Sequence, residues 1–316
     1  MCTSGPVATV AYYPREPSIG SVSAFSVVTD QPTGILSIVV SAVAADDVLL
    51  TIGYSTQISR VHNIALAGID PAIELLVCVQ GGFPEVNSTL ARARVIPVEG
   101  TGVARSRNAA MEQASGRYLL FCDDDVAVNL PGVAQGIRHL QETGRALVLG
   151  QGIDPAGSVR KRYPRSVTSL TRFNSAKAAT YEMLIDLRQV RATGVQFDVR
   201  FGAGSDLHLG DEYIFVADLL RAGLSGDALP VIFGTHPPES SGSQWGSAHD
   251  SHARAVVLNR VFGRWALGGR VAFGLKNWAN LGGWRPFLRF ISDSAEPPVP
   301  GSAFVHSHRA SSMSRD

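Results

Sequence analysis

Three consecutive aspartates follow a nearly all-apolar run. The run is Tyr118-Leu-Leu-Phe-Cys122, and Asp123, Asp124 and Asp125 come directly after it. Adjacent carboxylates repel one another unless a cation or hydrogen-bond donors offset that cost. Oxygen ligands suit Mg²⁺ or Mn²⁺, and in extended backbone Asp123 and Asp125 would project to the same side. We therefore predict a divalent-cation site here, and the alternative is a solvated acidic turn.

A second acidic group stands at the start of a predicted helix. The glycine-rich stretch 201–210 leads into Asp211 and Glu212, and the following residues to Ala222 have a helical pattern that ends at Gly223. The positive end of a helix favours ionised carboxylates, so simple charge complementarity is one interpretation. The other is a general base, which must lie within hydrogen-bond reach of the proton it removes.

Basic and imidazole side chains complete the set of candidate residues. Arg105 and Arg107 lie near the start of a predicted helix over 103–114, where they could neutralise phosphate charge or simply be solvated. His236 follows the apolar run 231–233. A single histidine is more often structural, but this one is also a candidate metal ligand.

Apolar runs alternate with helical segments and predict the scaffold that would position these residues. The runs cover residues 48–54, 73–79, 94–98, 118–122 and 146–149, and the helices 103–114, 131–143 and 211–222. Strands that are apolar on both faces indicate a parallel sheet covered by helices. In such α/β sheets ligands bind beyond the carboxyl ends of the strands. We expect loops from 150 to 179.

Composition narrows the class of protein. Hydrophobic residues make up 45% of the 316 residues and charged residues 17%, which is typical of a globular chain. A net charge of +1 argues against a globally basic nucleic-acid binder. Cys78 and Cys122 fall in apolar runs, no run is long enough to span a membrane, and no signal peptide is recognisable. We expect a cytoplasmic protein.

The C-terminal part is basic and aromatic. Residues 251–292 contain no Asp or Glu, whereas arginines, tryptophans and phenylalanines alternate through 254–290. Such a helical extension could contact the inner face of an anionic plasma membrane as a peripheral element. Alternatively its aromatic side chains pack on the core.

Two segments together resemble family 2 glycosyltransferases with the GT-A fold. Gly102-Val-Ala-Arg-Ser-Arg-Asn-Ala-Ala-Met111 and, after it, Gly116-Arg-Tyr-Leu-Leu-Phe-Cys-Asp-Asp-Asp125 are similar to that family's Ala-Arg-Asn helix and the strand that ends in Asp-X-Asp. The resemblance implies a Rossmann-like, mostly parallel sheet flanked by helices. It places Asp123 and Asp124 with the donor, Asp125 and Asp123 with Mn²⁺ or Mg²⁺, and Arg107 and Asn108 beside the donor.

The resemblance also implies an activity. The chain would be a hexosyltransferase-type enzyme that moves a sugar, with inversion, from a UDP-, GDP- or dTDP-linked donor to a glycan or lipid-linked acceptor, as in cell-surface polysaccharide or glycolipid assembly. His236, in His236-Pro-Pro-Glu-Ser-Ser-Gly242, would complete the metal site. The family's Gly-Glu-Asp-like motif becomes Gly210-Asp211-Glu212 here, so either Glu212 or Asp211 could be the base.

Two other functions remain as alternatives. A catalytically inactive nucleotide- or glycan-binding scaffold would explain the changed order at Asp211 and Glu212. A sugar nucleotidyltransferase is less favoured, because residues 51–60 contain only one glycine where a phosphate loop would stand. The expected domains are an extension over 1–45, a catalytic domain over 46–250, a helical extension over 251–292 and a loose tail over 293–316.

Overall fold

The computed structural model describes residues 26–29, 36–39, 48–64, 66, 69–82, 90–237 and 247–294. The chain divides into two units, residues 1–46 and 47–316. In the first unit, β1 (Ser26–Thr29) pairs antiparallel with β2 (Leu36–Val39). The rest of the predicted extension over 1–45 and almost all of the predicted tail over 293–316 lie outside the described residues. The domain boundaries expected from the sequence stay predictions.

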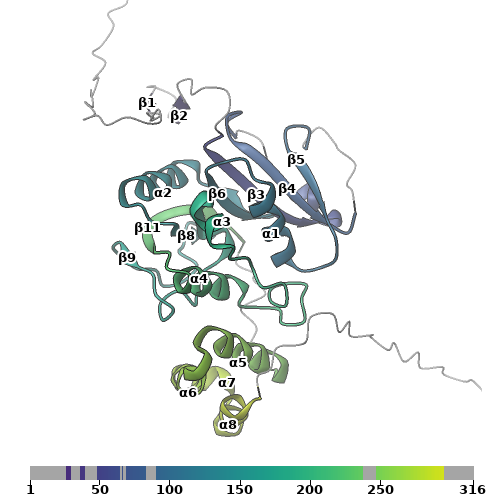
Figure 1. Cartoon of the computed structure of the whole chain (residues 1–316), viewed down its shortest axis with the longest axis vertical. Helices are drawn as coiled ribbons and strands as arrows, with labels where there is room; N and C mark the ends of the chain where they lie inside the picture. Colours follow the sequence, from purple (N-terminus) through teal and green to yellow (C-terminus); the bar gives the residue numbers. More distant parts are fainter. Residues whose placement is uncertain are drawn as a thin grey trace, which may run out of the picture. The chain divides into compact units, whose positions relative to one another are not determined.

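The second unit is built on one nine-stranded sheet with the order β5-β4-β3-β6-β10-β8-β11-β7, and β9 pairs beside β11 (Figure 1). The strands are β3 (Leu50–Gln57), β4 (Glu74–Gln80), β5 (Arg94–Val98), β6 (Tyr118–Asp123), β7 (Ala127–Val128), β8 (Leu147–Ile153), β9 (Thr168–Ser169), β10 (Met183–Asp186) and β11 (Gly226–Thr235). β10 is antiparallel to both of its neighbours, so β5, β4, β3, β6, β8 and β11 all run in one direction. The predicted mostly parallel α/β sheet is confirmed.

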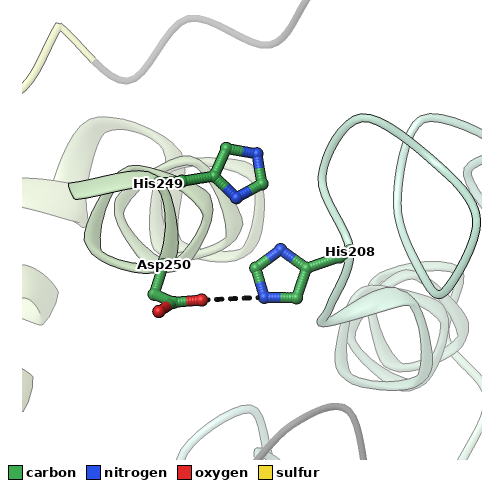
Figure 2. A group of neighbouring side chains, drawn as sticks. All are labelled: His208, His249 and Asp250. Carbon is green, nitrogen blue, oxygen red and sulfur yellow. Dashed lines mark ion pairs between the residues drawn. The ribbon is translucent and has the colours of Figure 1, made fainter. Parts of the chain in front are cut away.

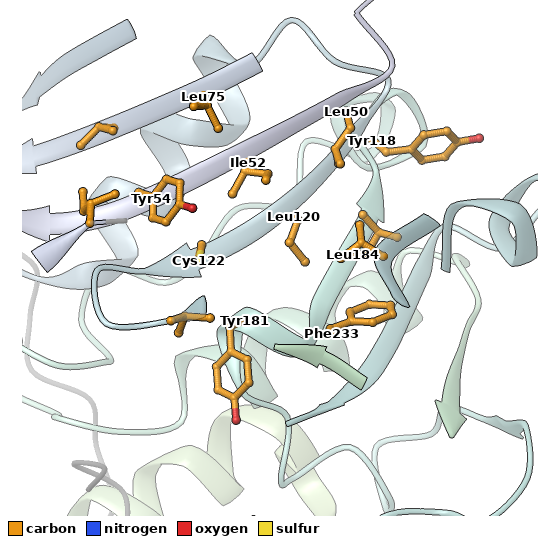
Figure 3. Packing of buried hydrophobic residues seen from close by; sticks show 14 of the residues in the cluster. Leu50, Ile52, Tyr54, Leu75, Tyr118, Leu120, Cys122, Tyr181, Leu184 and Phe233 are labelled. Carbon is orange, nitrogen blue, oxygen red and sulfur yellow. The ribbon is translucent and has the colours of Figure 1, made fainter. Parts of the chain in front are cut away.

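One face of the sheet packs against α2 (Leu130–Thr143) and the short 3-10 helix η1 (Ile58–Asn63). Alternate residues of the strands point to this face, and Figure 3 shows Ile52, Tyr54, Leu120 and Phe233 in the resulting core. Apolar residues of α2, among them Val133 and Ile137, complete it. This layer supports one face of the sheet, including β6, the strand that leads into the Asp triplet.

The opposite face packs against α1 (Val103–Gln113), α3 (Leu187–Thr193) and α4 (Asp211–Arg221). At its centre the rings of Phe197 and Phe215 stack at 4.0 Å, and Phe121 meets both rings edge-on. Because α1 and α4 lie on the same face, the residues near their N-termini can reach the carboxyl end of β6 between them.

The C-terminal helices are α5 (Ala248–Phe262), α6 (Ala266–Lys276), α7 (Trp278–Leu281) and α8 (Trp284–Ser292). α5 lies beside α4 (Figure 1). A third apolar core joins the C-terminal helices to α4, with Phe201, Ile214, Val256 and Phe290 all buried. The helical C-terminal extension is therefore confirmed, although α5 begins at Ala248, before the predicted residue 251. No helix in the described part of the chain is long and apolar enough to cross a membrane.

The expectation of loops from 150 to 179 is wrong in two places. β8 continues to Ile153, and the two-residue β9 pairs antiparallel with β11. Gly150 and Gly152 interrupt the apolar pattern of β8 because they leave room for the Phe233 and Tyr181 rings, whose atoms would overlap with a Cβ at either position. Between β3 and β4 the described residues form only the six-residue 3-10 helix η1.

Candidate functional site

The Asp triplet does not continue the extended backbone of β6. The strand ends at Asp123, and Asp124 and Asp125 form a turn. The expectation that Asp123 and Asp125 project to one side by strand alternation therefore fails, because the period of two holds only within a strand. Instead the three carboxylates reach three different sets of partners.

Arg107 of α1 connects the two acidic groups predicted from the sequence. Its side chain is 4% exposed, and its guanidinium pairs with Asp211 and lies 3.5 Å from Asp123 Oδ1 and 3.3 Å from Glu212 Oε1. A buried guanidinium is costly unless charged partners compensate for lost hydration. Asp123 at the end of β6, and Asp211 and Glu212 at the start of α4, provide that compensation. The two halves of the predicted site are therefore adjacent.

The neighbouring carboxylates of α4 stand in different environments. The Asp211 side chain is 4% exposed and packs on Gly202. A Cβ at position 202 would overlap with the Asp211 carboxyl group, so glycine makes room for it. The Glu212 side chain is 21% exposed and accepts a 2.7 Å hydrogen bond from Thr180 Oγ1. Burial and the nearby Glu212 charge raise the pKa of Asp211. Burial would also raise the pKa of Glu212, but Arg107 and the hydrogen bonds it receives lower it.

Asp124 and Asp125 are tied to the opposite side of the site by Arg60 of η1. The Arg60 guanidinium donates to Asp124 Oδ1 at 2.5 Å and to Asp125 Oδ2 at 3.0 Å. Asp124 is buried and also accepts a 2.6 Å hydrogen bond from Thr56 Oγ1 at the end of β3. The second aspartate is thus held by protein donors on both oxygens.

The first oxygen of Asp125 faces His236, just after β11. Asp125 Oδ1 is buried, has no hydrogen-bond donor among the described residues and lies 3.3 Å from His236 Nε2. The His236 ring stacks on Tyr181, and its Nδ1 lies 2.5 Å from the Pro237 carbonyl, which can only accept. Nδ1 therefore carries the proton, and in the neutral ring Nε2 presents its lone pair.

This pair of atoms fits a divalent cation. An orphaned carboxylate oxygen and an imidazole lone pair face each other, and both are atoms that bind metals through lone pairs. The Nδ1 bond to a backbone carbonyl is also the usual outer support of a metal-binding histidine. Asp125 and His236 are the residues that could hold the metal. Asp123 pairs with Arg107 on the side of α4.

The remaining predicted residues have structural partners. Asn108 exchanges two hydrogen bonds with the backbone of Phe197, at 2.9 and 2.8 Å, and so fixes the segment that leads toward the glycine-rich loop. Arg105 is exposed, whereas Arg107 is buried. Residues 238–242 of the segment that begins at His236 lie outside the described residues.

Sequence reasoning missed Thr56, Arg60, Thr180 and Tyr181. Thr56 and Arg60 follow the first apolar run just as Asp123 follows the fourth, so their position at a strand's carboxyl end was the available signal. Thr180 and Tyr181 form a single 3-10 turn before β10, in a stretch without a periodic pattern.

Comparison with known proteins adds a family. Residues 72–199 match the model described as glycosyl transferase family 2, a span that contains β4, α1, β6 and the Asp triplet. None of the curated proteins matches the chain at a significant level.

Solved structures of similar architecture include a Staphylococcus aureus protein. The S. aureus TarS 1–349 structure shares 14% identity with this chain, covers 78% of it and 82% of its own length, and has a TM-score of 0.47. A second TarS 1–349 structure, in complex with UDP-GlcNAc, has the same identity and coverage and a TM-score of 0.45. A mycobacterial protein shares 18% identity over 67% of this chain and 74% of its own, with a TM-score of 0.44.

Proposed function

We propose, on the premise that the chain belongs to glycosyl transferase family 2 over residues 72–199, that it moves a sugar from a nucleotide-diphosphate donor to an acceptor hydroxyl with inversion at the anomeric carbon. The observation that carries the proposal is the buried Arg107, which joins the carboxylate at the end of β6 to the pair that opens α4. A donor-binding group and a candidate base are thereby held in one site.

Asp125 and His236 are the residues we assign to the metal, Mn²⁺ or Mg²⁺. Such a cation, when bound, supplies positive charge that stabilises a departing nucleoside diphosphate. Arg60 keeps Asp125 oriented through the other carboxylate oxygen, and the Tyr181 ring keeps the His236 imidazole in place. Asp123 and Asp124 are assigned to the donor side, with Asn108 and Arg107 supporting the helix beside it.

Glu212 is the residue we assign as general base. It is the more exposed of the two α4 carboxylates, and Arg107 and Thr180 favour its ionised form. An ionised, accessible carboxylate can remove a proton from a hydroxyl that lies within hydrogen-bond distance. Asp211 is buried against Arg107, so we assign it to holding the guanidinium and the start of α4 in place.

Calorimetric titration with UDP, GDP and dTDP tests the donor site. With Mn²⁺ present we expect one of the three nucleotides to bind the purified chain. We expect EDTA or Asp125→Ala to weaken binding at least tenfold, since the variant removes the oxygen that faces His236. Asp154→Ala, at an exposed turn after β8, is the matched control and should bind normally. No binding of any nucleotide under these conditions would favour the catalytically inactive scaffold instead.

The acceptor proposal rests on the surface of the last helices. Trp265, Leu267, Leu275 and Trp284 are each at least 58% exposed, and they lie among cationic residues in a segment without acidic side chains up to Ser292. Exposed tryptophans beside arginines suit the interface of an anionic bilayer. We propose that α6–α8 contact the membrane and that the acceptor is lipid-linked or lies close to the membrane, as in cell-surface glycan assembly.

Vesicle sedimentation tests the membrane contact. We expect the chain to sediment with vesicles that contain phosphatidylglycerol, less with pure phosphatidylcholine, and less in high salt, because headgroup charge is screened. Replacing Trp265 and Trp284 together with alanine should reduce bound protein several-fold. The control is Phe173→Ala, an exposed aromatic residue outside these helices. Equal sedimentation of both variants would contradict the proposal.

A further inference from the structure

A second group of potential metal ligands lies outside the site described above. His208 belongs to the loop before α4, and His249 and Asp250 belong to the first turn of α5 (Figure 2). One ligand atom from each residue lies within 4.8 Å of the other two. His208 Nε2 is already 3.0 Å from Asp250 Oδ1, and the His208 and His249 rings stack at 5.1 Å. None of the three belongs to the proposed transferase site.

Each of the two α5 ligands is oriented by a partner on its other polar atom. His249 Nε2 lies 3.1 Å from the Asp206 carbonyl, so Nε2 carries the proton and Nδ1 presents a lone pair. Asp250 Oδ2 accepts hydrogen bonds from the Ser247 hydroxyl at 2.6 Å and the Ser247 amide at 3.3 Å. Its Oδ1 is thereby left to face His208. Metal-binding histidines and carboxylates are supported in this same way.

The ligand types decide the class of cation. Two imidazoles and one carboxylate suit Zn²⁺, whereas Mg²⁺ and Ca²⁺ prefer sites built entirely from oxygen. Zinc–nitrogen bonds of about 2.0 Å place ligand atoms of a tetrahedral site roughly 3.3 Å apart. His208 and Asp250 already meet that spacing, and the His249 ligand atom lies within 4.8 Å of both.

We propose that His208, His249 and Asp250 bind a Zn²⁺ ion that links the loop before α4 to the N-terminus of α5. The three protein ligands leave the fourth tetrahedral position to water. The loop that carries His208 ends at Gly210, directly before Asp211 and Glu212, so the bound ion restrains the backbone that leads into α4. This proposal does not depend on the transferase activity.

Metal binding to the purified full-length chain tests the site. After EDTA treatment and its removal, we expect calorimetry with Zn²⁺ and metal analysis after dialysis to show an equivalent of zinc that both His249→Ala and His208→Ala lose. Asp125→Ala should keep this equivalent, which separates it from any zinc held by Asp125 and His236. Co²⁺ should give the visible absorption of a tetrahedral nitrogen–oxygen site in the wild type.

The control is His252→Ala, which removes another partly exposed histidine of the same helix. It should retain the zinc equivalent. Zinc should also raise the thermal unfolding temperature of the wild type and of His252→Ala more than that of His249→Ala, which removes an exposed side chain in the first turn of α5. Wild-type zinc stoichiometry and affinity in both His249→Ala and His208→Ala would overturn the proposal.

Discussion

At the scale of single residues, Arg107 is the partner that the acidic groups share. Its guanidinium pairs with one oxygen of the buried Asp211 and lies near Glu212 and Asp123. Removing a partner from a buried charge costs more than the net value of the pair, because the remaining charge is left poorly solvated. Asp211 and Glu212 should therefore respond differently to neutral substitution, although they are adjacent in sequence.

We expect Glu212→Gln to lower kcat about 100-fold or more, which is the usual contribution of a general base, while nucleotide binding and stability change little. Asp211→Ala should mainly lower the free energy of unfolding, by about 1–3 kcal/mol, because the buried Arg107 loses a hydrogen-bond acceptor. Transfer assays and urea unfolding of both variants make the comparison. A 100-fold loss of kcat in Asp211→Ala without loss of stability would reverse the two assignments.

The site could be predicted from sequence only where chemistry coincides with an element boundary. Asp123–Asp125 follow the end of an apolar run and Asp211–Glu212 begin a helix. Both the residue types and their positions at these boundaries could therefore be recognised in the sequence. The partners of Arg60 and Thr180 could not be assigned from sequence, because they are 64 and 32 residues away and only the sheet order brings each pair together.

At the scale of elements, close packing of α2 on the sheet depends on glycine. A Cβ at Gly132, in the first turn of α2, would lie 1.9 Å from the Ile232 backbone oxygen of β11. Backbone cannot yield as a side-chain end can, so the helix would have to move away from the strand that leads to His236. By contrast, a Cβ at Gly268 in α6 would meet no described atom within 4 Å.

We expect Gly132→Ala to destabilise the fold by about 1–3 kcal/mol, the usual cost of overpacking. Gly268→Ala should stabilise it by up to about 1 kcal/mol, because alanine is the better residue in a helix interior. Urea unfolding of the two variants measures both effects against the wild type. Equal stability of all three proteins would show that α2 can shift without cost.

The elements themselves were predictable where hydrophobic pattern and length agree. The runs at 48–54, 73–79, 94–98 and 118–122 all became parallel strands, and the helices α1, α2 and α4 begin and end within about two residues of their predicted bounds. β10 was not predicted, since Met183–Asp186 is only four residues long, and its antiparallel place between β6 and β8 follows from tertiary pairing.

At the scale of the whole molecule, charged bridges tie the C-terminal helices to the sheet domain. Arg260 of α5 donates to both oxygens of Asp218 in α4, at 3.0 and 2.6 Å. It also lies 3.5 Å from Asp198 Oδ2, and Arg200 binds both oxygens of the same carboxyl group. Asp198 thus joins the segment before the glycine-rich loop to α5 through Arg260, and Arg200 of the same segment holds the Asp198 carboxyl group in place.

Acid should weaken this bridge in a defined pH range. Partial burial would raise the pKa of Asp198, but the hydrogen bonds from Arg200 and the charges of Arg200 and Arg260 outweigh it and lower the pKa. A depressed carboxyl pKa contributes stability above the unfolded value, about 3.9 for Asp, and loses it as the pH falls toward the folded value.

We therefore expect Asp198→Asn to cost about 1–3 kcal/mol at pH 7, the range for hydrogen bonds to charged groups, and progressively less below about pH 4. Urea unfolding of wild type and variant across this range measures the difference, and Asp70→Asn, on an exposed turn before β4, should show no such convergence. A cost that stays constant down to pH 3 would mean that Asp198 acts through packing and not through its charge.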